Sequence, residues 1–232
     1  NPLVGLEERA KLLNELGQAL IRHKHMFEFG DALRPGNLYD YFLQRQEKGV
    51  LAAREILIAI LKSMGEIWPD GSWVDSIAIG DAAYHEAVKR SDITDRIVPF
   101  HKLSQWMSYS LIEPLQLAGM KIIHLDALTG LAEYRNGGLF IDTGTISLRD
   151  KTEMETLHDP KSPLIVEWRA LTVTLLDQLA EQIRRHTNTN AESMPLVSIL
   201  QGGTWSAGRR IAQRLRSDAS PPLRLKSRGT IF

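Results

Sequence analysis

The segment from Asp126 to Asp142 holds the residues of this 232-residue sequence that are best suited to chemistry. Three carboxylates, Asp126, Glu133 and Asp142, lie among glycines that let the backbone approach a ligand closely. Paired carboxylates can hydrolyse a glycosidic bond, because one stabilises the sugar cation or attacks it while the other protonates the leaving group or activates water. The same composition is typical of a turn-forming acidic loop, so the residue types alone leave both interpretations open.

A second cluster of polar and aromatic side chains follows Pro99. If this segment is helical, His101 and Gln105 share one face and Lys102 and Trp106 share another, because residues four apart are neighbours on a helix. These side chains could line a pocket. The alternative interpretation is an ordinary amphipathic helix.

A third set consists of Glu167 and Arg169, inside the clearest helical segment of the chain. Residues two apart point to different sides of a helix, so each should pair with another element. We expect them to hold the glycine-rich segment, either as structural contacts or at the site. A glycine turn at residues 201–209 enters another helix, and its backbone N–H groups could hold a phosphate.

Several classes of site have no sequence signature. There is no cysteine, which excludes thiol catalysis, disulfides and Cys-ligated metal and is typical of a reducing compartment. The seven histidines form no HExxH pattern, and no GxSxG, Walker or GxGxxG motif occurs. We therefore expect no metal and no cofactor. No apolar run would span a bilayer and no signal-peptide pattern opens the chain, so we expect a cytoplasmic protein without a membrane partner.

The charges balance overall but are unevenly distributed. The formal net charge of +0 argues against nucleic acid as a partner, because duplex binding needs a wide basic surface. From Lys161 onward there are 11 Lys and Arg against 5 Asp and Glu. This excess is either a solvated face or a site for an anionic group, which arginines suit. Its main contributors are Arg209, Arg210, Arg214, Arg216, Arg224, Lys226 and Arg228.

The elements that must position these residues are mainly helices, with a minor β component. In residues 5–22, the spacing of Leu6, Ala10, Leu13, Leu16 and Leu20 predicts an amphipathic helix. Periodicity and capping signals predict further helices at 37–46, 50–64, 97–117 (ended or kinked by Pro114), 162–186 and 206–215. Loops are expected at 23–36 and 187–195, and a turn at 68–71. Short strands are expected at 121–125, 139–148 and 223–232, and Gly202-Gly203 should break the chain between two elements.

At these clusters the sequence resembles the C-terminal portion of the uracil catabolism protein 4 family. The resemblance covers most of the chain in the stretches NPLVGLEERAKLLNELGQAL, RPGNLYDYFL, VPFHKLSQWMSYSLIEPLQLAG, LDALTGLAEYRNGGLFIDTG, VEWRALTVTLLDQLA and LQGGTWSAGRRIA. Members of that family are longer. The resemblance therefore implies that a substantial N-terminal part is missing and that part of the site lies in it.

The chain is also similar, more distantly, to the queuosine salvage proteins, which are N-glycosylases with a helical fold like that of helix-hairpin-helix DNA glycosylases. The similarity lies in four short stretches in the same order, at residues 7–17, 100–105, 130–135 and 165–169. It implies one helical domain over 1–232 with that fold and minor strands. It also implies that Glu133 stands where that family has a functional Asp, one methylene shorter.

These observations lead to a first hypothesis of N-glycosidic hydrolysis of a nucleoside, nucleotide or ribosylurea in uracil breakdown. Glu133 would stabilise the ribosyl cation or activate water, with Asp126 or Asp142 as the second carboxylate. The residues expected to bind substrate are His101, Lys102, Gln105, Tyr134, Arg135, Glu167 and Arg169. A second hypothesis is a non-catalytic nucleotide-binding or scaffold protein of the same pathway. A third, a nucleic-acid glycosylase, is disfavoured by the neutral charge.

Overall fold

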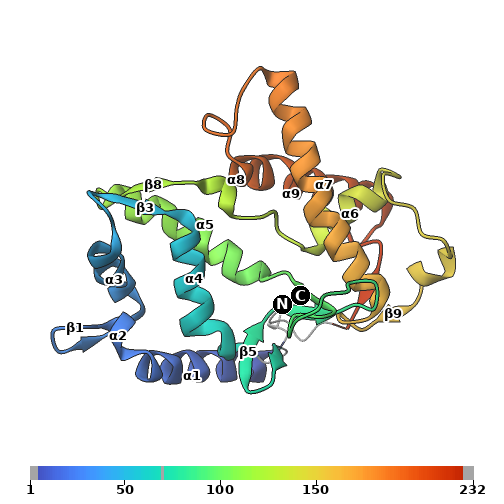
Figure 1. Cartoon of the computed structure of the whole chain (residues 1–232). Helices are drawn as coiled ribbons and strands as arrows, with labels where there is room; N and C mark the ends of the chain where they lie inside the picture. The colour runs from blue at the N-terminus through green and yellow to red at the C-terminus, as the bar shows by residue number, and fades with distance from the viewer. Residues whose placement is uncertain (1–4, 69–70, 227–232) are drawn as a thin grey trace. The chain divides into compact units, whose positions relative to one another are not determined.

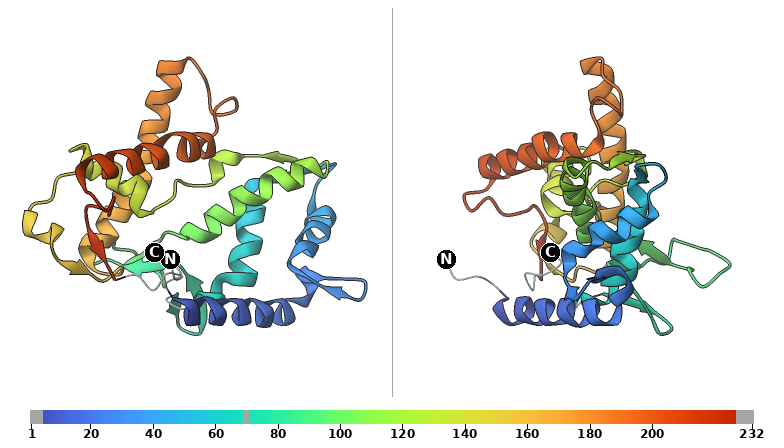
Figure 2. Two further views of the ribbon diagram at one scale, coloured as in Figure 1. Left: turned by 180° about the vertical axis from the view of Figure 1, so that it is seen from behind. Right: turned by 90° about the vertical axis from the view of Figure 1, so that its left-hand side faces the viewer.

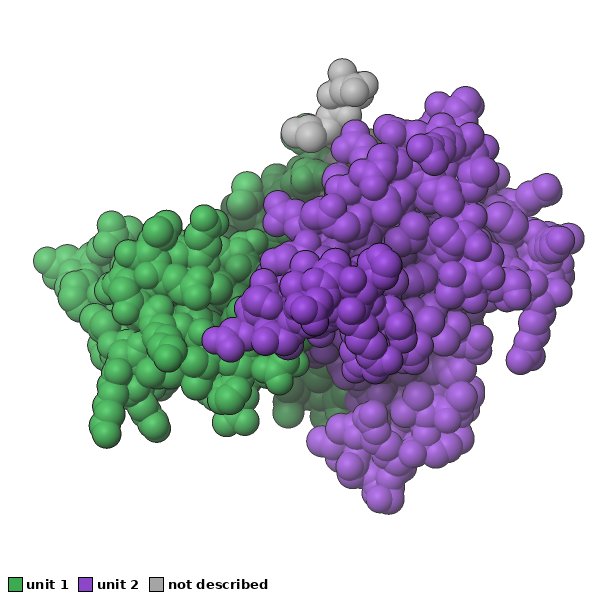
Figure 3. Space-filling view, turned by 90° about the horizontal axis from the view of Figure 1, so that it is seen from above, with its two compact units in different colours: residues 1–82, 103–128, 228–231 green, residues 83–102, 129–227, 232 purple. Residues whose placement is uncertain are grey.

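The computed structural model describes residues 5–68 and 71–226 (Figure 1). These residues are mainly helical, and their short strands form two-stranded ribbons. Contacts divide the described residues into two compact units (Figure 3): unit 1 comprises residues 5–68, 71–82 and 103–128, and unit 2 comprises residues 83–102 and 129–226. The chain thus changes unit after residues 82, 102 and 128. That residues 1–232 fold as one domain stays a prediction.

Unit 1 is built around the helix α4, which is apolar on several sides. Its helices are α1 (Leu6–Arg22), α2 (Lys24–Phe27), α3 (Leu38–Arg45), α4 (Ala53–Met64) and most of α5 (Lys102–Leu117). Its strands are β1 (Glu28–Phe29), β2 (Ala32–Leu33), β3 (Val50–Ala52), β4 (Ser72–Val74), β5 (Ile77–Gly80) and β8 (Lys121–Ile123). Ile56 and Ile60 of α4 are fully buried in the core, together with Phe27 and Phe42. The strands β3 and β8 pair in parallel, which joins residues 71 apart in the sequence.

Unit 2 is a set of helices packed on the short helix α6. Its helices are α6 (Tyr134–Asp142), α7 (Pro163–Thr187), α8 (Leu196–Ile199) and α9 (Trp205–Leu215). Its strands are β6 (Ala82–Tyr84, whose first residue is grouped with unit 1), β7 (Ile97–Pro99), β9 (Leu157–His158) and β10 (Arg224–Leu225). α6 packs against α9 and α7, and the indole N–H of Trp168 on α7 donates to the carbonyl of Gly137 on α6 at 3.0 Å. Trp168 is buried with Ile165 and Leu223.

Close packing in unit 2 depends on glycine. A Cβ at Gly137 would lie 2.6 Å from Thr172 Oγ1, and a Cβ at Gly208 would collide with the carbonyl oxygen of Arg135. Helices carrying glycine at their contact can therefore approach more closely than side chains would allow. This approach brings α6, α7 and α9 together around the start of α6.

Most of the predicted helices are confirmed, with short displacements at their ends. Residues 50–52 and 97–99 form strands instead of helix starts, and the segment expected as a loop at 23–36 contains α2 and the β1–β2 hairpin. Pro114 lies inside α5 without ending it. The predicted turn at 68–71 is closed by a bond from Gly71 N–H to Trp68 O at 3.0 Å, although residues 69–70 lie outside the described residues.

Three predictions from local composition were wrong. The first half of the β-leaning segment 139–148 belongs to α6, where Phe140 is buried and tertiary packing overrides strand propensity. Gly202-Gly203 does not break the chain, because α8, a π-helix at Leu200–Thr204 and α9 form one continuous run. The expected single apolar face of α1 also differs: Leu6 and Leu13 are exposed, while Leu12, Leu16 and Leu20 pack on the core.

At the C-terminus, Arg224 and Leu225 of the predicted strand at 223–232 pair with β9, and residues 227–232, Arg228 included, lie outside the described part of the chain. No helix among the described residues is long and apolar enough to cross a membrane.

Candidate functional site

The candidate site lies at the N-terminus of α6, where Glu133 precedes the helix in an extended conformation. One carboxylate oxygen of Glu133 accepts the backbone N–H of Arg135 at 2.8 Å, and the other accepts the N–H of Asn136 at 2.5 Å. The first N–H groups of a helix have no partner within the helix and form its positive end. Glu133 therefore caps α6 with both oxygens, and its chain is long enough to reach two donors.

A buried hydrogen-bonded pair holds this helix start from behind. The side chain of Asn136 donates to the carbonyl of Leu131 at 3.3 Å and accepts the hydroxyl of Thr204 at 2.9 Å. Asn136 and Thr204 are almost completely buried. Thr204 ends the π-helix, and such helices occur often at functional sites. The π-helix thus fixes the residue whose backbone N–H binds Glu133.

Burial dominates the electrostatics of Glu133. Burial raises the pKa of the Glu133 carboxyl above its ordinary value, because a low-dielectric surrounding disfavours the charged form. The N–H groups of Arg135 and Asn136 act in the opposite direction, as do the charges of Lys102 and Arg135, without cancelling the effect. A carboxyl with a raised pKa next to a lysine is suited to general acid–base catalysis near neutral pH.

Arg169 brings the three clusters of the sequence together. Its guanidinium carbon lies 4.0 Å from the centre of the Phe100 ring, and its Nε donates to the carbonyl of Ala132 at 3.3 Å. Arg169 is 4 % exposed, so this contact is part of the interior. The expectation that Arg169 holds the glycine-rich segment is confirmed. Its binding of a substrate stays a prediction.

Glu167 contacts a different element from the one expected. Its carboxylate lies 3.1 Å from Nε2 of His85, in the segment that follows β6. Nδ1 of His85 accepts the backbone N–H of Ala87, so the proton of the neutral ring lies on Nε2 and is donated to Glu167. Glu167 therefore anchors the segment after β6 to α7, on a different side of the helix from Arg169.

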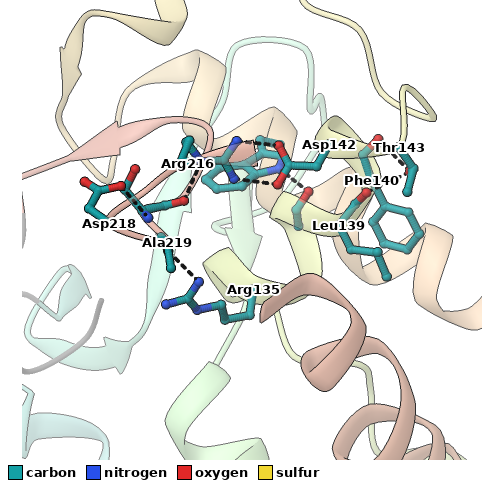
Figure 4. Close-up of polar contacts among 11 residues, drawn as sticks. Arg135, Leu139, Phe140, Asp142, Thr143, Arg216, Asp218 and Ala219 are labelled. Carbon is teal, nitrogen blue, oxygen red and sulfur yellow. Dashed lines mark hydrogen bonds and ion pairs between the residues drawn. The ribbon is translucent and has the colours of Figure 1, made fainter. Parts of the chain in front are cut away.

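Tyr134 and Arg135 directly follow Glu133, and the Arg135 side chain also contacts the C-terminal segment. Arg135 Nη1 donates to the carbonyl of Ala219 at 2.8 Å (Figure 4), and its guanidinium lies over the ring of Tyr134. His101 lies between β7 and α5 and has a positive φ of 49°, and Lys102 is the first residue of α5. Such a backbone is uncommon for a residue with a Cβ and occurs often at functional sites.

Asp142 lies at the other end of α6, about 14 Å along the helix from Glu133 at 1.5 Å per residue. Arg216 binds both of its oxygens, at 2.8 and 2.6 Å (Figure 4). Two catalytic carboxylates of a glycosidase are separated by about 5–9.5 Å. The structure thus does not bring Asp142 to Glu133, and it gives Asp142 a partner of its own.

Asp126 and Gln105 belong to unit 1, whereas the other expected residues belong to unit 2. Asp126 is exposed in the short 3-10 helix Leu125–Ala127, and Gln105 is buried in α5. Their part in a site with Glu133 stays a prediction.

Sequence reasoning missed Asn136 and Thr204, and it named Arg216 only as part of the basic excess, not as the partner of Asp142. The Asn-Gly-Gly after Arg135 and the Gly-Gly-Thr at 202–204 are visible in the sequence. The hydrogen bond that joins Asn136 to Thr204 across 68 residues is not visible there. The predicted phosphate turn at 201–209 was wrong, because the backbone N–H groups there lie inside a continuous helical run and not at a helix start. Among residues 5–68 and 71–226, no group of three His, Asp or Glu side chains could hold a metal ion.

Comparison with known families decides where this chain belongs. All of residues 1–232 match the family described as "Protein of unknown function (DUF1688)". The chain belongs to this family. The DUF1688 chain is 37% identical to Protein urg3 of Schizosaccharomyces pombe (strain 972 / ATCC 24843), covering 100% of the chain and 55% of that protein. It is 36% identical to Uracil catabolism protein 4 of Lachancea kluyveri, covering 100% of the chain and 58% of that protein.

The DUF1688 chain thus spans a little over half the length of these two curated relatives. The resemblance to the uracil catabolism protein 4 family is confirmed. No solved structure matches the chain at a significant level.

Proposed function

We propose that the complete protein takes part in uracil or pyrimidine breakdown and hydrolyses the N-glycosidic bond of a ribosylated intermediate, which is a nucleoside, a nucleotide or a ribosylurea. The observation that carries this proposal is Glu133, a partly buried carboxyl with a raised pKa, held by two N–H groups beside the charge of Lys102. The kinship with a protein named Uracil catabolism protein 4 supplies the pathway.

In the proposed reaction, a water molecule attacks the anomeric carbon while the bond between that carbon and nitrogen breaks. The ribosyl group carries positive charge in the transition state, and an ionised Glu133 stabilises it. The Glu133 carboxylate accepts the proton of the attacking water and then returns it to the departing nitrogen. The products are ribose, or ribose phosphate, and the free amide or urea.

Neighbouring cations have roles that fit a polar or phosphorylated substrate. Lys102 and Arg135 act on Glu133 electrostatically and would position ribose or phosphate. Arg169 would act as a positioning residue, because its bond to Ala132 sets the backbone that leads into Glu133. Asp126 remains the proposed second carboxylate.

Ribose release by a full-length family member tests this proposal. The protein is incubated with uridine, uridine monophosphate and ribosylurea, and free reducing sugar is measured. Glu133→Gln keeps the size of the side chain and one acceptor oxygen but cannot take a proton. We expect it to lower the rate by about 10²–10⁴-fold.

Glu192→Gln is the matched control, since Glu192 is exposed in the loop after α7. It should retain full activity. Unchanged activity in Glu133→Gln would refute the assigned role, and no sugar release from any of the three compounds would refute the hydrolase.

One observation favours a second candidate, a non-catalytic nucleotide-binding or scaffold protein. Both oxygens of Glu133 already accept backbone N–H groups, which is the arrangement of a purely structural cap. Tight binding of uridine monophosphate without turnover by the full-length protein would support this candidate over the hydrolase.

Two finer predictions belong to the same proposal. The helices packed on α6 would form a domain like that of helix-hairpin-helix DNA glycosylases, which a solved structure of a full-length member would test. The absence of cysteine is typical of a cytoplasmic protein, and microscopy of a tagged full-length member would test that location.

A further inference from the structure

The helix α1 carries apolar residues on two sides, and the core of unit 1 covers only one of them. Leu12, Leu16, Ala19 and Leu20 face the core. The other side forms what we call the outer stripe, which consists of Leu6, Ala10, Leu13, Gly17 and Ile21. Its three large side chains are 61%, 68% and 52% exposed for Leu6, Leu13 and Ile21 respectively. α1 runs along an edge of unit 1 in both views of Figure 2.

The outer stripe is symmetric about its own centre. Leu6 and Ile21 lie at equal distances from a point between Leu13 and Asn14, about 11 Å away along the helix. Ala10 and Gly17 lie at equal distances from the same point, about 5 Å away. If a second α1 packs antiparallel across this point, large residues face large ones, small residues face small ones, and the two copies of Leu13 meet near the two-fold axis.

The small residues permit such an approach. A Cβ at Gly17 would meet nothing within 4 Å, so the surface there is open. Small side chains at a helix contact let the two backbones come closer, and the flanking leucines then interdigitate. A two-fold contact of this kind buries the same patch on both copies.

The charges of α1 also suit an antiparallel pair. Glu7 and Glu8 lie in the first turn and Arg22 in the last. A two-fold axis across the helices keeps like flanks together, so Glu7 of one copy lies beside Gln18 of the other, while Arg22 is held within its own copy by Glu66 at 2.7 Å. Antiparallel helix dipoles add a favourable term. In a parallel pair, Glu7 and Glu8 of one copy would instead lie beside Glu7 and Glu8 of the other.

We propose that the outer stripe of α1 binds a second copy of this chain, through an antiparallel α1–α1 contact with Leu13 near the two-fold axis. The occupant is another α1, because the spacing of large and small residues in the stripe complements itself and an antiparallel pair keeps Glu7 and Glu8 of the two copies apart. Two helices of 17 residues make an interface at the small end of the range for specific complexes. The dimer therefore dissociates on dilution.

A single introduced cysteine gives a direct test, because the chain has none of its own. In the proposed dimer the two Leu13 Cα atoms lie within about 7 Å, which is within the reach of a disulfide. Leu13→Cys should form a covalent dimer under a mild oxidant at micromolar concentration. Leu117→Cys is the matched control, since Leu117 is 83% exposed at the end of α5 and should cross-link far less. Equal cross-linking of the two variants would overturn the proposal.

Sedimentation over a range of concentrations provides the second test. The wild-type chain should move from 26.1 kDa toward twice that mass as its concentration rises. Leu13→Glu places two like charges near the two-fold axis and should weaken association at least tenfold, with unchanged circular dichroism because Leu13 is largely exposed. A monomer at every concentration would overturn the proposal. If α1 is then found shielded from solvent in a longer relative, the stripe is covered by the rest of that chain. Association that Leu13→Glu does not weaken would equally contradict the contact.

Discussion

Two effects with opposite consequences for the charge of Glu133 act on this residue at the start of α6. A carboxylate stabilises the positive end of a helix when it is ionised, but burial favours its protonated form. In this protein burial prevails and the pKa of Glu133 is raised, although two N–H groups donate to the carboxylate. An exposed Ser or Asp would cap α6 without this conflict. The conflict is therefore the feature that distinguishes Glu133 from an ordinary cap.

The raised pKa of Glu133 predicts how stability depends on pH. The folded state holds the Glu133 proton to a higher pH than the unfolded state, so this group contributes full stability below the unfolded pKa. That contribution is lost as the pH rises through the folded pKa. In Glu133→Gln this loss should disappear, and its unfolding free energy relative to wild type should rise across that window.

Urea unfolding of both proteins at intervals between about pH 4 and 7 measures the difference. A constant difference across the range would contradict the raised pKa. Asp177 also has a pKa raised by burial, so it must stay unchanged in both proteins for the comparison to isolate Glu133.

The ion pair between Asp142 and Arg216 predicts a second effect at the scale of single residues. The Asp142 side chain is 4% exposed, so Arg216→Met would leave a carboxylate buried without its partner. We expect a loss of about 3 kcal/mol in unfolding free energy. In the double variant with Asp142→Asn, the loss should be smaller than in Arg216→Met alone. A loss in the double variant equal to the sum of the losses in the two single variants would show that the pair contributes no coupling.

The start of α6 depends on how closely elements distant in the sequence approach it. α9 passes so close to α6 that only glycine fits at position 208, and α7 approaches Gly137 in the same way. Thr204, in the π-helix that leads into α9, fixes Asn136 from the same side. The site geometry is thus a property of three packed helices and not of the acidic segment alone.

Two glycine substitutions separate packing from helix propensity. Alanine is the better helix former by about 1 kcal/mol, so Gly17→Ala on the open face of α1 should stabilise the protein by about 0.5–1 kcal/mol. Gly208→Ala should instead destabilise it by about 2–3 kcal/mol, because the new Cβ collides with the Arg135 carbonyl. Denaturant midpoints at high dilution compare the two. Stabilisation of both would show that α6 and α9 are not in close contact.

Local signals predicted the long helices well and the pairings poorly. The start of α7 at Ser162-Pro163 and the end of α1 at Arg22 follow from residues that are adjacent in the sequence. The ribbon of β3 and β8 joins residues 50–52 to 121–123, and no local pattern specifies that partner. Glu133 was identified by residue type and resemblance. Its neighbours Asn136 and Thr204 could not be identified from the sequence. They belong to the site because both are buried and because they are hydrogen-bonded to each other across the chain.

At the scale of the whole molecule, the path of the chain decides what can fold alone. Among the described residues, the buried core around α4 is formed by residues between 19 and 128. By contrast, the small core that Arg169 touches combines Ala83 and Phe100 with Ala132 and Val166. Unit 2 therefore needs a segment that lies inside the sequence of unit 1.

This organisation predicts an asymmetry between two fragments. Residues 1–128 should unfold cooperatively on heating, because they keep the whole core around α4. Residues 129–232 should lack a cooperative transition, because Ala83 and Phe100 are missing from their core. Circular dichroism melts of the two fragments test this. A sharp transition in 129–232 would show that the inserted segment is dispensable.

The alternation of the chain between the two units also limits how the gene can be rearranged. A unit encoded by one uninterrupted stretch of gene can be duplicated, lost or fused to another protein in a single event. Neither unit here is encoded in that way, because the chain changes unit after residues 82, 102 and 128. A recombination breakpoint at any of the three positions leaves one unit without a strand or a helix that it needs. Gene rearrangement can therefore transmit the two units only together, which agrees with a family whose match extends over residues 1–232 without interruption.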